Sequence, residues 1–340
     1  MKALLIGPEN PHFLGHLRTL QALEEVTSIT LVASDPSDAA LLEQARAAHP
    51  ERVGALSLDF ADALRGEVDF VVACPRNDRA VDVITSALQA GKPVLAEKPA
   101  GRTAAETAQI VEVARQAGLP LGVCYQNRLH PAALAARAFD ADGLLGELMA
   151  VEMRYSTTQL RFRDPKHWLF NKSLSGGGVL HWLGCHYLDL APYVTGQPIV
   201  EARGRIATRS GEAVDVEDVA ALSLTFANGA SGSLSCGYVL AQSGGGFYNQ
   251  SGNDTHLAFI GRLGRVWWTP TKSPSTVNFE TTHPDWAFAP RRTVTYELPE
   301  SGAYGGVAGI EFVRRFIQGA PVATGEDALR VARLLETVYA

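Results

Sequence analysis

The chain has 340 residues, of which 46% are hydrophobic and 19% charged, and its formal net charge is -6. This length indicates two domains, and the composition is that of a globular protein with enough apolar material for a sizeable core. The acidic balance argues against a nucleic-acid-binding surface, and no apolar run approaches the roughly 20 residues that a membrane-spanning helix needs.

Signals for export are also lacking in the sequence. The apolar run from Met1 to Ile6 is too short for a secretory signal, and Pro8 follows it closely. The four cysteines are widely spaced in apolar sequence and form no C-x-x-C pair, so we predict buried free thiols in a reducing, cytoplasmic compartment. They are Cys74, Cys124, Cys185 and Cys236.

Strands and helices alternate over the first part of the chain. Short turns between them are typical of βαβ units with right-handed crossovers, which build a parallel doubly wound (Rossmann) sheet. We therefore predict an N-terminal nucleotide-binding domain over residues 1–123. The expected strands are 2–6, 27–33, 53–56, 68–73, 94–96 and 119–123, and the expected helices are 11–24, 38–48, 79–90 and 104–117.

Residues 124–340 show a different pattern, in which long strands follow one another. Asn228-Gly229 between two of them is a strong hairpin signal. This arrangement predicts an α+β domain with a large, mostly antiparallel open sheet, which we expect to cover its second face in part by self-association. The expected strands are 148–157, 200–208, 219–226, 230–238, 256–260, 265–268 and 293–298, and the expected helices are 131–139, 179–193, 307–318 and 325–339.

The end of the first strand predicts a dinucleotide site. Gly7 and Pro8 lead from that strand to a helix, and a helix N-terminus at this place can hold a pyrophosphate. The second strand ends in Asp35, whose carboxylate can accept both hydrogen bonds of an adenosine ribose diol and would repel a 2′-phosphate. This predicts NAD, with NADP as the alternative. A simple helix cap is the other interpretation of Asp35.

The glycine loop of this site is unusual. Residues 7–15 read Gly-Pro-Glu-Asn-Pro-His-Phe-Leu-Gly, which keeps only the first glycine of the G-x-G-x-x-G fingerprint. Glu9 places a negative charge near the expected phosphate. Arg76 or Arg79, after the fourth strand, could supply compensating positive charge.

Three segments connect the two halves to a known family. They are Ala-Leu-Gln-Ala-Gly-Lys-Pro-Val-Leu-Ala-Glu-Lys-Pro at 87–99, Gly-Gly-Gly-Val-Leu at 176–180 and His-Tyr-Leu-Asp-Leu at 186–190. With them the chain resembles the Gfo/Idh/MocA (glucose–fructose oxidoreductase/inositol dehydrogenase) family over nearly its whole length. The resemblance implies an NAD(P)-dependent dehydrogenase of sugars, cyclitols or related polyols, and a homodimer or homotetramer assembled through the C-terminal sheet.

The resemblance also implies roles for single residues. Glu97 and Lys98 match the family's Glu-Lys-Pro pair, and His186 matches its catalytic histidine. Lys98 would stabilise negative charge on the reacting oxygen and His186 would exchange the hydroxyl proton, while a nicotinamide carries the hydride. The alternatives without a catalytic role are a surface lysine at a strand end for Lys98 and a structural histidine for His186. The expected cofactor contacts are Gly7, Pro8, Asp35, Cys74, Pro75, Arg76, Glu97 and Lys98.

A turn and a single residue depart from the family pattern. The family's T-P-N-x-x-H turn reads Cys-Pro-Arg-Asn-Asp-Arg at 74–79, and Trp182 stands four residues before His186, where an aspartate is usual. We predict that Asp189, three residues after His186, orients the imidazole as a further member of the catalytic set. Trp182 could stack on a sugar ring, with core packing as the alternative.

The remaining candidates concern the substrate. Residues 161–168 are polar and aromatic and precede the triple glycine, and 125–128 follow the last Rossmann strand, so both are expected to line a cleft between the domains. A solvated loop is the other interpretation of 161–168. No metal site is predicted, because His181, Cys185 and His186 do not converge and lack a nearby carboxylate. The expected substrate contacts are Tyr125, Arg163, His167, Trp168, Trp182 and His186.

Two other functions stay open from the sequence. One is redox-assisted elimination or hydrolysis, in which bound NAD is recycled without net oxidation. The other is a non-catalytic nucleotide-binding protein, which the incomplete glycine loop and Trp182 favour, whereas the retained Lys98 and His186 favour an enzyme.

Overall fold

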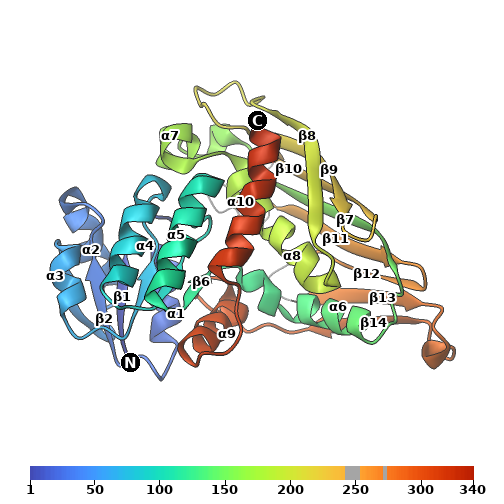
Figure 1. Cartoon of the computed structure of the whole chain (residues 1–340), viewed down its shortest axis with the longest axis horizontal. Helices are drawn as coiled ribbons and strands as arrows, with labels where there is room; N and C mark the ends of the chain where they lie inside the picture. Colours follow the sequence, from blue (N-terminus) through green and yellow to red (C-terminus); the bar gives the residue numbers. More distant parts are fainter. Residues whose placement is uncertain (242–252, 271–273) are drawn as a thin grey trace. The chain divides into compact units, whose positions relative to one another are not determined.

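The computed structural model describes residues 1–241, 253–270 and 274–340 (Figure 1). The chain packs as two units: Met1–Leu129 with Ser301–Ala332, and His130–Glu300 with Arg333–Ala340. This division differs from the predicted boundary after residue 123, because 124–129 and 301–332 pack with the first unit. The reason is pairing at the last Rossmann strand, where Thr324 forms a bridge with Gly122 and the amide of Val123 donates to Ala323.

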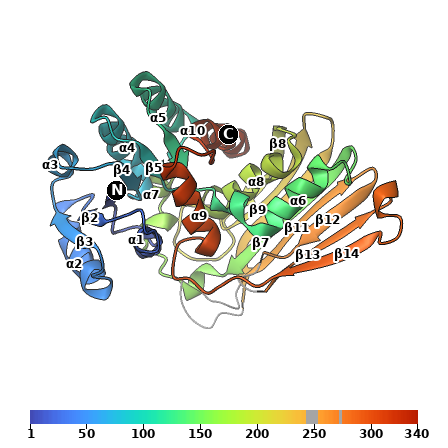
Figure 2. The same cartoon turned by 90° about the horizontal axis from the view of Figure 1, so that it is seen from below.

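The first unit contains a six-stranded parallel sheet in the order β3-β2-β1-β4-β5-β6, which confirms the predicted Rossmann sheet. Helices α4 and α5 pack together on one face, and α1 and α9 on the other (Figure 2). Because both faces are covered, strands such as β4 are buried at every position. The elements are β1 (Lys2–Ile6), α1 (Phe13–Gln21), β2 (Ser28–Val32), α2 (Ala39–Ala48), β3 (Val53–Ser57), α3 (Phe60–Arg65), β4 (Phe70–Ala73), α4 (Ala80–Gln89), β5 (Val94–Ala96), α5 (Ala104–Ala117), β6 (Leu121–Val123) and α9 (Gly306–Ile317).

Local sequence signals account for several of these boundaries. Thr103 caps α5 by accepting a hydrogen bond from the Glu106 amide at 3.1 Å, and Gly118 ends it in the left-handed conformation with φ of 65°. Helix α1 begins at Phe13, two residues later than predicted. The residues before it form a turn, in which the Asn10 side chain accepts from the His12 amide at 2.9 Å.

The second unit contains an eight-stranded sheet in the order β14-β13-β12-β11-β7-β10-β9-β8. Only β7 and β10 pair in parallel among these described strands, which confirms the prediction of a mostly antiparallel sheet. The predicted hairpin is also present, with Gly229 at φ of 85° between β9 and β10. The strands are β7 (Leu148–Thr158), β8 (Ile199–Ala207), β9 (Val219–Phe226), β10 (Ser231–Leu240), β11 (Asp254–Gly261), β12 (Gly264–Trp268), β13 (Ser275–Thr281) and β14 (Arg291–Tyr296).

Helices α6 (Pro131–Ala141) and α8 (Cys185–Thr195) pack together and contact this sheet. Burial alternates along strands such as β9 and β13, so one face of the sheet forms the core and the other is more exposed in the single chain. The short helix α7 (Lys172–Ser175) precedes the triple glycine, and α10 (Gly325–Tyr339) runs from the first unit into the second.

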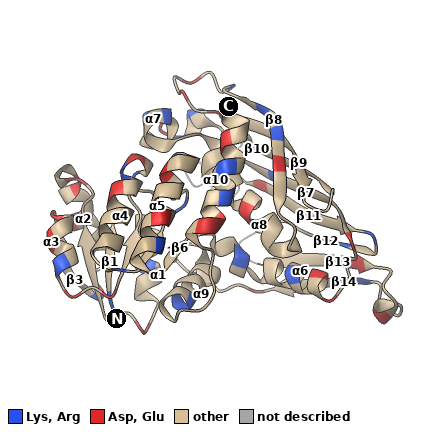
Figure 3. Ribbon diagram, viewed as in Figure 1, with Lys and Arg blue, Asp and Glu red and all other residues tan. Residues whose placement is uncertain are grey.

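Charged residues of both signs are scattered over the helices and strands (Figure 3). On α10, for example, Asp327 pairs with Arg330 one turn later and with Arg128 at 3.0 Å. Within the described ranges, no helix combines the length and the apolar character that crossing a membrane would require.

Candidate active site

Glu97 and Lys98 directly follow strand β5, at the carboxyl edge of the Rossmann sheet. Both side chains are buried, and Lys98 is 0% exposed. Lys98 is therefore not a surface lysine at a strand end. Its Nζ lies 3.9 Å from Oε1 of Glu97, and the following Lys98–Pro99 peptide bond is cis. An ammonium group held this far from water interacts strongly with any charge that develops beside it.

The Glu97 carboxylate is held by three side chains from distant segments. Oε1 lies 3.1 Å from Nδ1 of His12 and accepts a hydrogen bond from the Tyr304 hydroxyl at 3.0 Å, while Oε2 lies 2.6 Å from Nε2 of His16. Burial by itself would raise the pKa of Glu97, but attraction and hydrogen bonds from His12 and His16 outweigh it and hold the pKa well below the usual range. Because an ionised carboxylate only accepts hydrogen bonds, each facing ring nitrogen carries a proton.

The histidine nearest the glycine loop is kept neutral by the same burial. Burial lowers the pKa of His12 from 6.5 to about 4, although the Glu97 charge opposes the shift. At neutral pH, His12 therefore contributes a hydrogen bond from an uncharged ring to Glu97, and the Lys98 side chain has the carboxylate 3.9 Å away.

We predict that acidification destabilises the protein as the pH falls from 6.5 to about 4. In this window the unfolded chain binds a proton at His12 and the folded chain does not, so the free energy of unfolding decreases as the pH falls. The shift corresponds to on the order of 3 kcal/mol. Urea unfolding at several pH values should show a shallower dependence for His12→Gln. His49→Gln, at the half-exposed end of α2, is the control, and equal slopes for His12→Gln and the parent would contradict the prediction.

The end of β1 has the close backbone approach that a dinucleotide site requires. Gly7 has a φ of 105°, and a Cβ at this position would lie 2.1 Å from the carbonyl oxygen of Cys74. Cys74 and Pro75 follow β4, and both are buried. Together with the acid after β2, this glycine cradle fits a nicotinamide dinucleotide lying across the carboxyl edge of the sheet.

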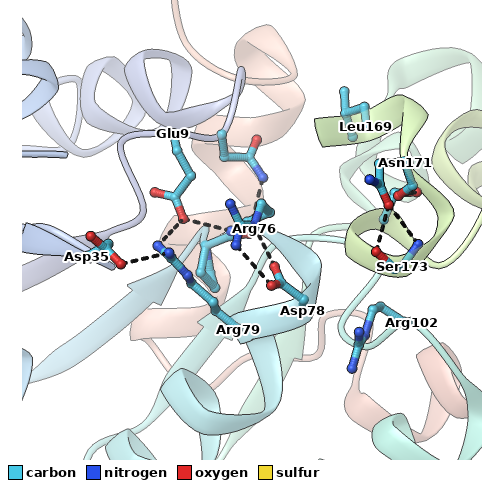
Figure 4. A network of polar contacts seen from close by, with 12 residues as sticks. Glu9, Asp35, Arg76, Asp78, Arg79, Arg102, Leu169, Asn171 and Ser173 are labelled. Carbon is cyan, nitrogen blue, oxygen red and sulfur yellow. Dashed lines mark hydrogen bonds and ion pairs between the residues drawn. The ribbon is translucent and has the colours of Figure 1, made fainter. Parts of the chain in front are cut away.

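The charged residues predicted for this edge form one network (Figure 4). Arg79 donates from Nη2 to Asp35 at 2.9 Å, and its Nη1 lies 3.9 Å from Glu9. Asp35 also accepts from the amide and hydroxyl of Ser37 and so caps the turn Pro36–Asp38, and these bonds hold its pKa below the usual value. Arg76 forms a two-pronged pair with Asp78, at 2.6 and 3.0 Å.

In the second unit, a buried carboxylate caps the segment that carries His186. Glu217 accepts from the amide of Gly178 at 2.7 Å, from the amide of Leu180 at 3.0 Å and from the Tyr339 hydroxyl at 2.8 Å. These bonds satisfy amides at the helix start that would otherwise lack partners, and negative charge is favourable there. Glycine is required because a Cβ on Gly178 would lie 1.9 Å from the Glu217 carbonyl oxygen.

The predicted single helix over 179–193 is divided in the structure. A π-helical turn, Leu180–Gly184, precedes α8, and Gly184 permits it because a Cβ there would lie 2.7 Å from the Leu180 side chain. Trp182 lies in the π-helical turn, and His186 and Asp189 lie in the first turns of α8, all three buried. Residues four apart share a face of a regular α-helix. Because Trp182 lies in the wider π-helical turn, this spacing does not apply to Trp182 and His186.

Four of the predicted substrate residues are joined by aromatic contacts within the second unit. The rings of Trp182 and Trp168 pack edge-to-face, with their centroids 6.0 Å apart. The centroids of the Trp168 and His167 rings are 5.6 Å apart. The Arg163 guanidinium lies 4.9 Å from the ring of Tyr238 and donates to the Thr158 carbonyl at 3.0 Å. Phe170 links the two halves of this group, since it contacts both His167 and Tyr238.

The other predicted residues lie in the first unit. Tyr125 follows β6 and is 2% exposed. His16, Cys74 and Glu97 place possible metal-ligand atoms within 4.8 Å of one another, the one such group in the described ranges. Burial raises the pKa of the Cys74 thiol well above its usual value, which disfavours the thiolate that binds metals, and the His16–Glu97 hydrogen bond accounts for the other two. All four cysteines are free and buried, as predicted.

Sequence reasoning did not identify the residues that hold the candidate catalytic groups. The three side chains that hold Glu97 lie 81 or more positions from it in the sequence. Glu217 lies 37 positions from the Leu180 amide that it caps and 122 from Tyr339. The only local signal was the i, i+4 histidine pair after the glycine loop, because two such histidines share a helix face. The missed residues are His12, His16, Tyr304, Glu217 and Tyr339.

Comparison with known proteins places both halves of the chain in one family. A model of the oxidoreductase family NAD-binding Rossmann fold (GFO_IDH_MocA) matches residues 7–125, and a model of the GFO/IDH/MocA C-terminal domain matches residues 133–266. Levoglucosan dehydrogenase of Pseudarthrobacter phenanthrenivorans is 27% identical over 187 residues, covering 48% of this chain and 47% of the relative. Inositol 2-dehydrogenase 2 of Saccharopolyspora erythraea is 28% identical over 216 residues, covering 63% and 60%.

The chain thus spans about half the length of the curated relatives it matches. The structural likeness is more extensive. A levoglucosan dehydrogenase in complex with NADH and levoglucosan has a TM-score of 0.85 at 20% identity, with 100% of this chain and 96% of that chain covered. An oxidoreductase domain protein from Kribbella flavida has a TM-score of 0.84 at 23% identity, with 99% and 95% covered. These likenesses show the fold, and with the two family models they establish that the chain belongs to the Gfo/Idh/MocA family of NAD-binding oxidoreductases.

Proposed function

We propose that this protein is an NAD-dependent dehydrogenase that transfers a hydride between a nicotinamide and a secondary hydroxyl carbon of a sugar, cyclitol or related polyol. The observation that carries the proposal is the fully buried Lys98 at the carboxyl end of β5, beside the ionised Glu97. Relatives named levoglucosan dehydrogenase, inositol 2-dehydrogenase and D-glucoside 3-dehydrogenase support the substrate class.

Each candidate residue has a chemical role in this reaction. The nicotinamide, when bound, supplies the hydride chemistry. Lys98 donates a hydrogen bond to the reacting oxygen and stabilises its negative charge as the alcohol becomes a carbonyl. His186 takes the hydroxyl proton, and Asp189 positions the imidazole. The substrate contacts are assigned to Tyr125, Arg163, His167, Trp168, Trp182 and His186.

Asp35 supports NAD over NADP. Its carboxylate accepts from Ser37 and pairs with Arg79, so it is ionised at neutral pH, and it can also accept from the ribose hydroxyls. A 2′-phosphate would meet this negative charge. Dehydrogenase assays should therefore be run with both nicotinamide cofactors.

The experiment is an absorbance screen for NADH formation across levoglucosan, inositols, aldoses and sugar acids, with product analysis by mass spectrometry. We expect oxidation of at least one polyol, with NADH formed in equal amount. A product formed without net NADH would instead identify redox-assisted elimination or hydrolysis. Absence of any conversion, with NADH binding intact, would favour a non-catalytic nucleotide-binding protein.

We also propose that the protein forms a homodimer or homotetramer through the more exposed face of the second unit's sheet. Val200 on β8 and Met149 on β7 are 60% and 52% exposed in the single chain, and a second copy packed on this face would cover them. Light scattering should give a mass of two or four chains, and Val200→Glu with Met149→Glu should shift it toward the monomer. A parent protein that is monomeric at micromolar concentration would contradict this assembly.

A further inference from the structure

Three loops at the carboxyl edge of the Rossmann sheet are linked by charge (Figure 4). Glu9 follows β1, Asp35 follows β2 and Arg79 follows β4. Because the sheet order is β2-β1-β4, an arginine that reaches from the β4 side to Asp35 must cross the end of β1. The end of β1 is where a dinucleotide crosses such a sheet, so the network lies on the expected path of the cofactor.

Glu9 occupies the place of the second fingerprint glycine, which normally lets the backbone approach the pyrophosphate. Its Oε1 accepts from the Arg76 amide at 2.9 Å and lies 3.9 Å from Nη1 of Arg79. A backbone amide and a guanidinium are the groups that bind phosphate oxygens in proteins. The Glu9 carboxylate is therefore hydrogen-bonded to a backbone amide of the loop after β4 that could otherwise bind a phosphate oxygen.

The charge balance around Glu9 is unfavourable for a second anion. Four carboxylates face two guanidinium groups at this edge, and a pyrophosphate adds two further negative charges. Burial raises the pKa of Glu9 above its usual value, with hydrogen bonding to the Arg76 amide opposing the shift and the Asp38 charge adding to it. Protonation of Glu9 therefore requires less free energy than that of an exposed glutamate. The charged or titratable groups that face it are Cys74, Arg76, Arg79 and Asp38, with Asp35 linked through Arg79 and Asp78 through Arg76.

We propose that the Glu9 carboxylate competes with the pyrophosphate of the cofactor for the Arg76 amide and the Arg79 guanidinium, so that binding of the dinucleotide is coupled to proton uptake by Glu9. The proposal rests on the NAD cofactor of the family and is independent of which polyol is the substrate. The sign follows from linkage: the bound phosphates favour the neutral carboxyl group, so affinity increases as the pH falls. Glu9 thus sets the affinity of a loop that has lost two of its three glycines.

The test is calorimetric titration of the intact protein with NADH in two buffers that differ in ionisation enthalpy. We expect net uptake of up to one proton per NADH and an NADH Kd that increases as the pH rises from about 5 to about 8. Glu9→Gln removes the charge while keeping the shape of the side chain. It should abolish this proton uptake and lower the Kd for NADH about tenfold at the upper end of that range.

Two controls separate this mechanism from general electrostatics. Glu24→Gln removes an exposed carboxylate from the same unit and should leave the Kd and the proton uptake unchanged. Adenosine lacks the pyrophosphate, so its binding should show neither the proton uptake nor the response to Glu9→Gln. In an Arg79→Met background, Glu9→Gln should improve NADH affinity less, because the cation that is competed for is gone.

The outcomes are decisive in both directions. If Glu9→Gln binds NADH with the parent Kd and the parent proton uptake, the proposal is overturned. If Glu9→Gln does not fold, as judged by its thermal transition, the parent titrations with NADH and adenosine decide, and equal proton uptake for the two ligands overturns it. None of these measurements requires turnover, so they are unaffected if the polyol dehydrogenase activity is not found.

Discussion

Lys98→Met is expected to lower kcat/KM for the polyol by about 10²- to 10³-fold, with a smaller effect on the Kd for NADH. Methionine matches the length and apolar stem of lysine, so the buried site stays filled. It lacks the ammonium group, and the negative charge that develops on the reacting oxygen then loses its stabilising donor. Steady-state kinetics and NADH titration by fluorescence provide the two measurements.

The fold around this position should survive the substitution. Glu97 keeps its contacts with His12, His16 and Tyr304, so the buried carboxylate is not left without donors. Lys92→Met is the matched control, because Lys92 is a half-buried lysine just before β5 whose Nζ donates to the Val68 carbonyl. A Lys98→Met protein that retains kcat/KM within threefold of the parent would show that Lys98 is not catalytic.

Gly178→Ala is expected to destabilise the protein by on the order of 3 kcal/mol. The added Cβ would lie 1.9 Å from the Glu217 carbonyl oxygen, so the two backbones must separate. That separation lengthens the bond from the Val179 amide to the Glu217 carbonyl, now 3.0 Å, and the bond from the Gly178 amide to the carboxylate. Both bonds hold the start of the segment that carries His186.

Urea unfolding followed by tryptophan fluorescence measures this loss, since Trp168 and Trp182 lie in the same unit. Gly66→Ala is the matched control. Gly66 is exposed, has a φ of -72°, and a Cβ there would meet its nearest atom only at 3.2 Å, so a change below about 1 kcal/mol is expected. Equal stability of Gly178→Ala and the parent would mean that the close approach to Glu217 is not required.

Local patterns in the sequence were sufficient for most of the fold. The helix predicted at 104–117 is α5 without change, since Thr103 and Gly118 cap it, and the strand predicted at 219–226 is β9 without change. Strand β13 was missed although its burial alternates residue by residue, and in the structure it pairs with β12 and β14. The packing of 301–332 with the first unit was missed because it depends on contacts between segments that are distant in the sequence.

For the candidate site, the sequence by itself was enough to propose the chemistry-bearing residues, because Glu97, Lys98 and His186 stand in motifs that are read along the chain. It also determined that the glycine loop is incomplete. Only the tertiary structure decided what surrounds these groups: His12, His16 and Tyr304 around Glu97, Glu217 at the start of the His186 segment, and Arg79 between Asp35 and Glu9. The physical reason is that a motif or a helix cap is a short-range property. A buried carboxylate, in contrast, takes its donors from whichever segments packing brings beside it, and that packing depends on the whole chain.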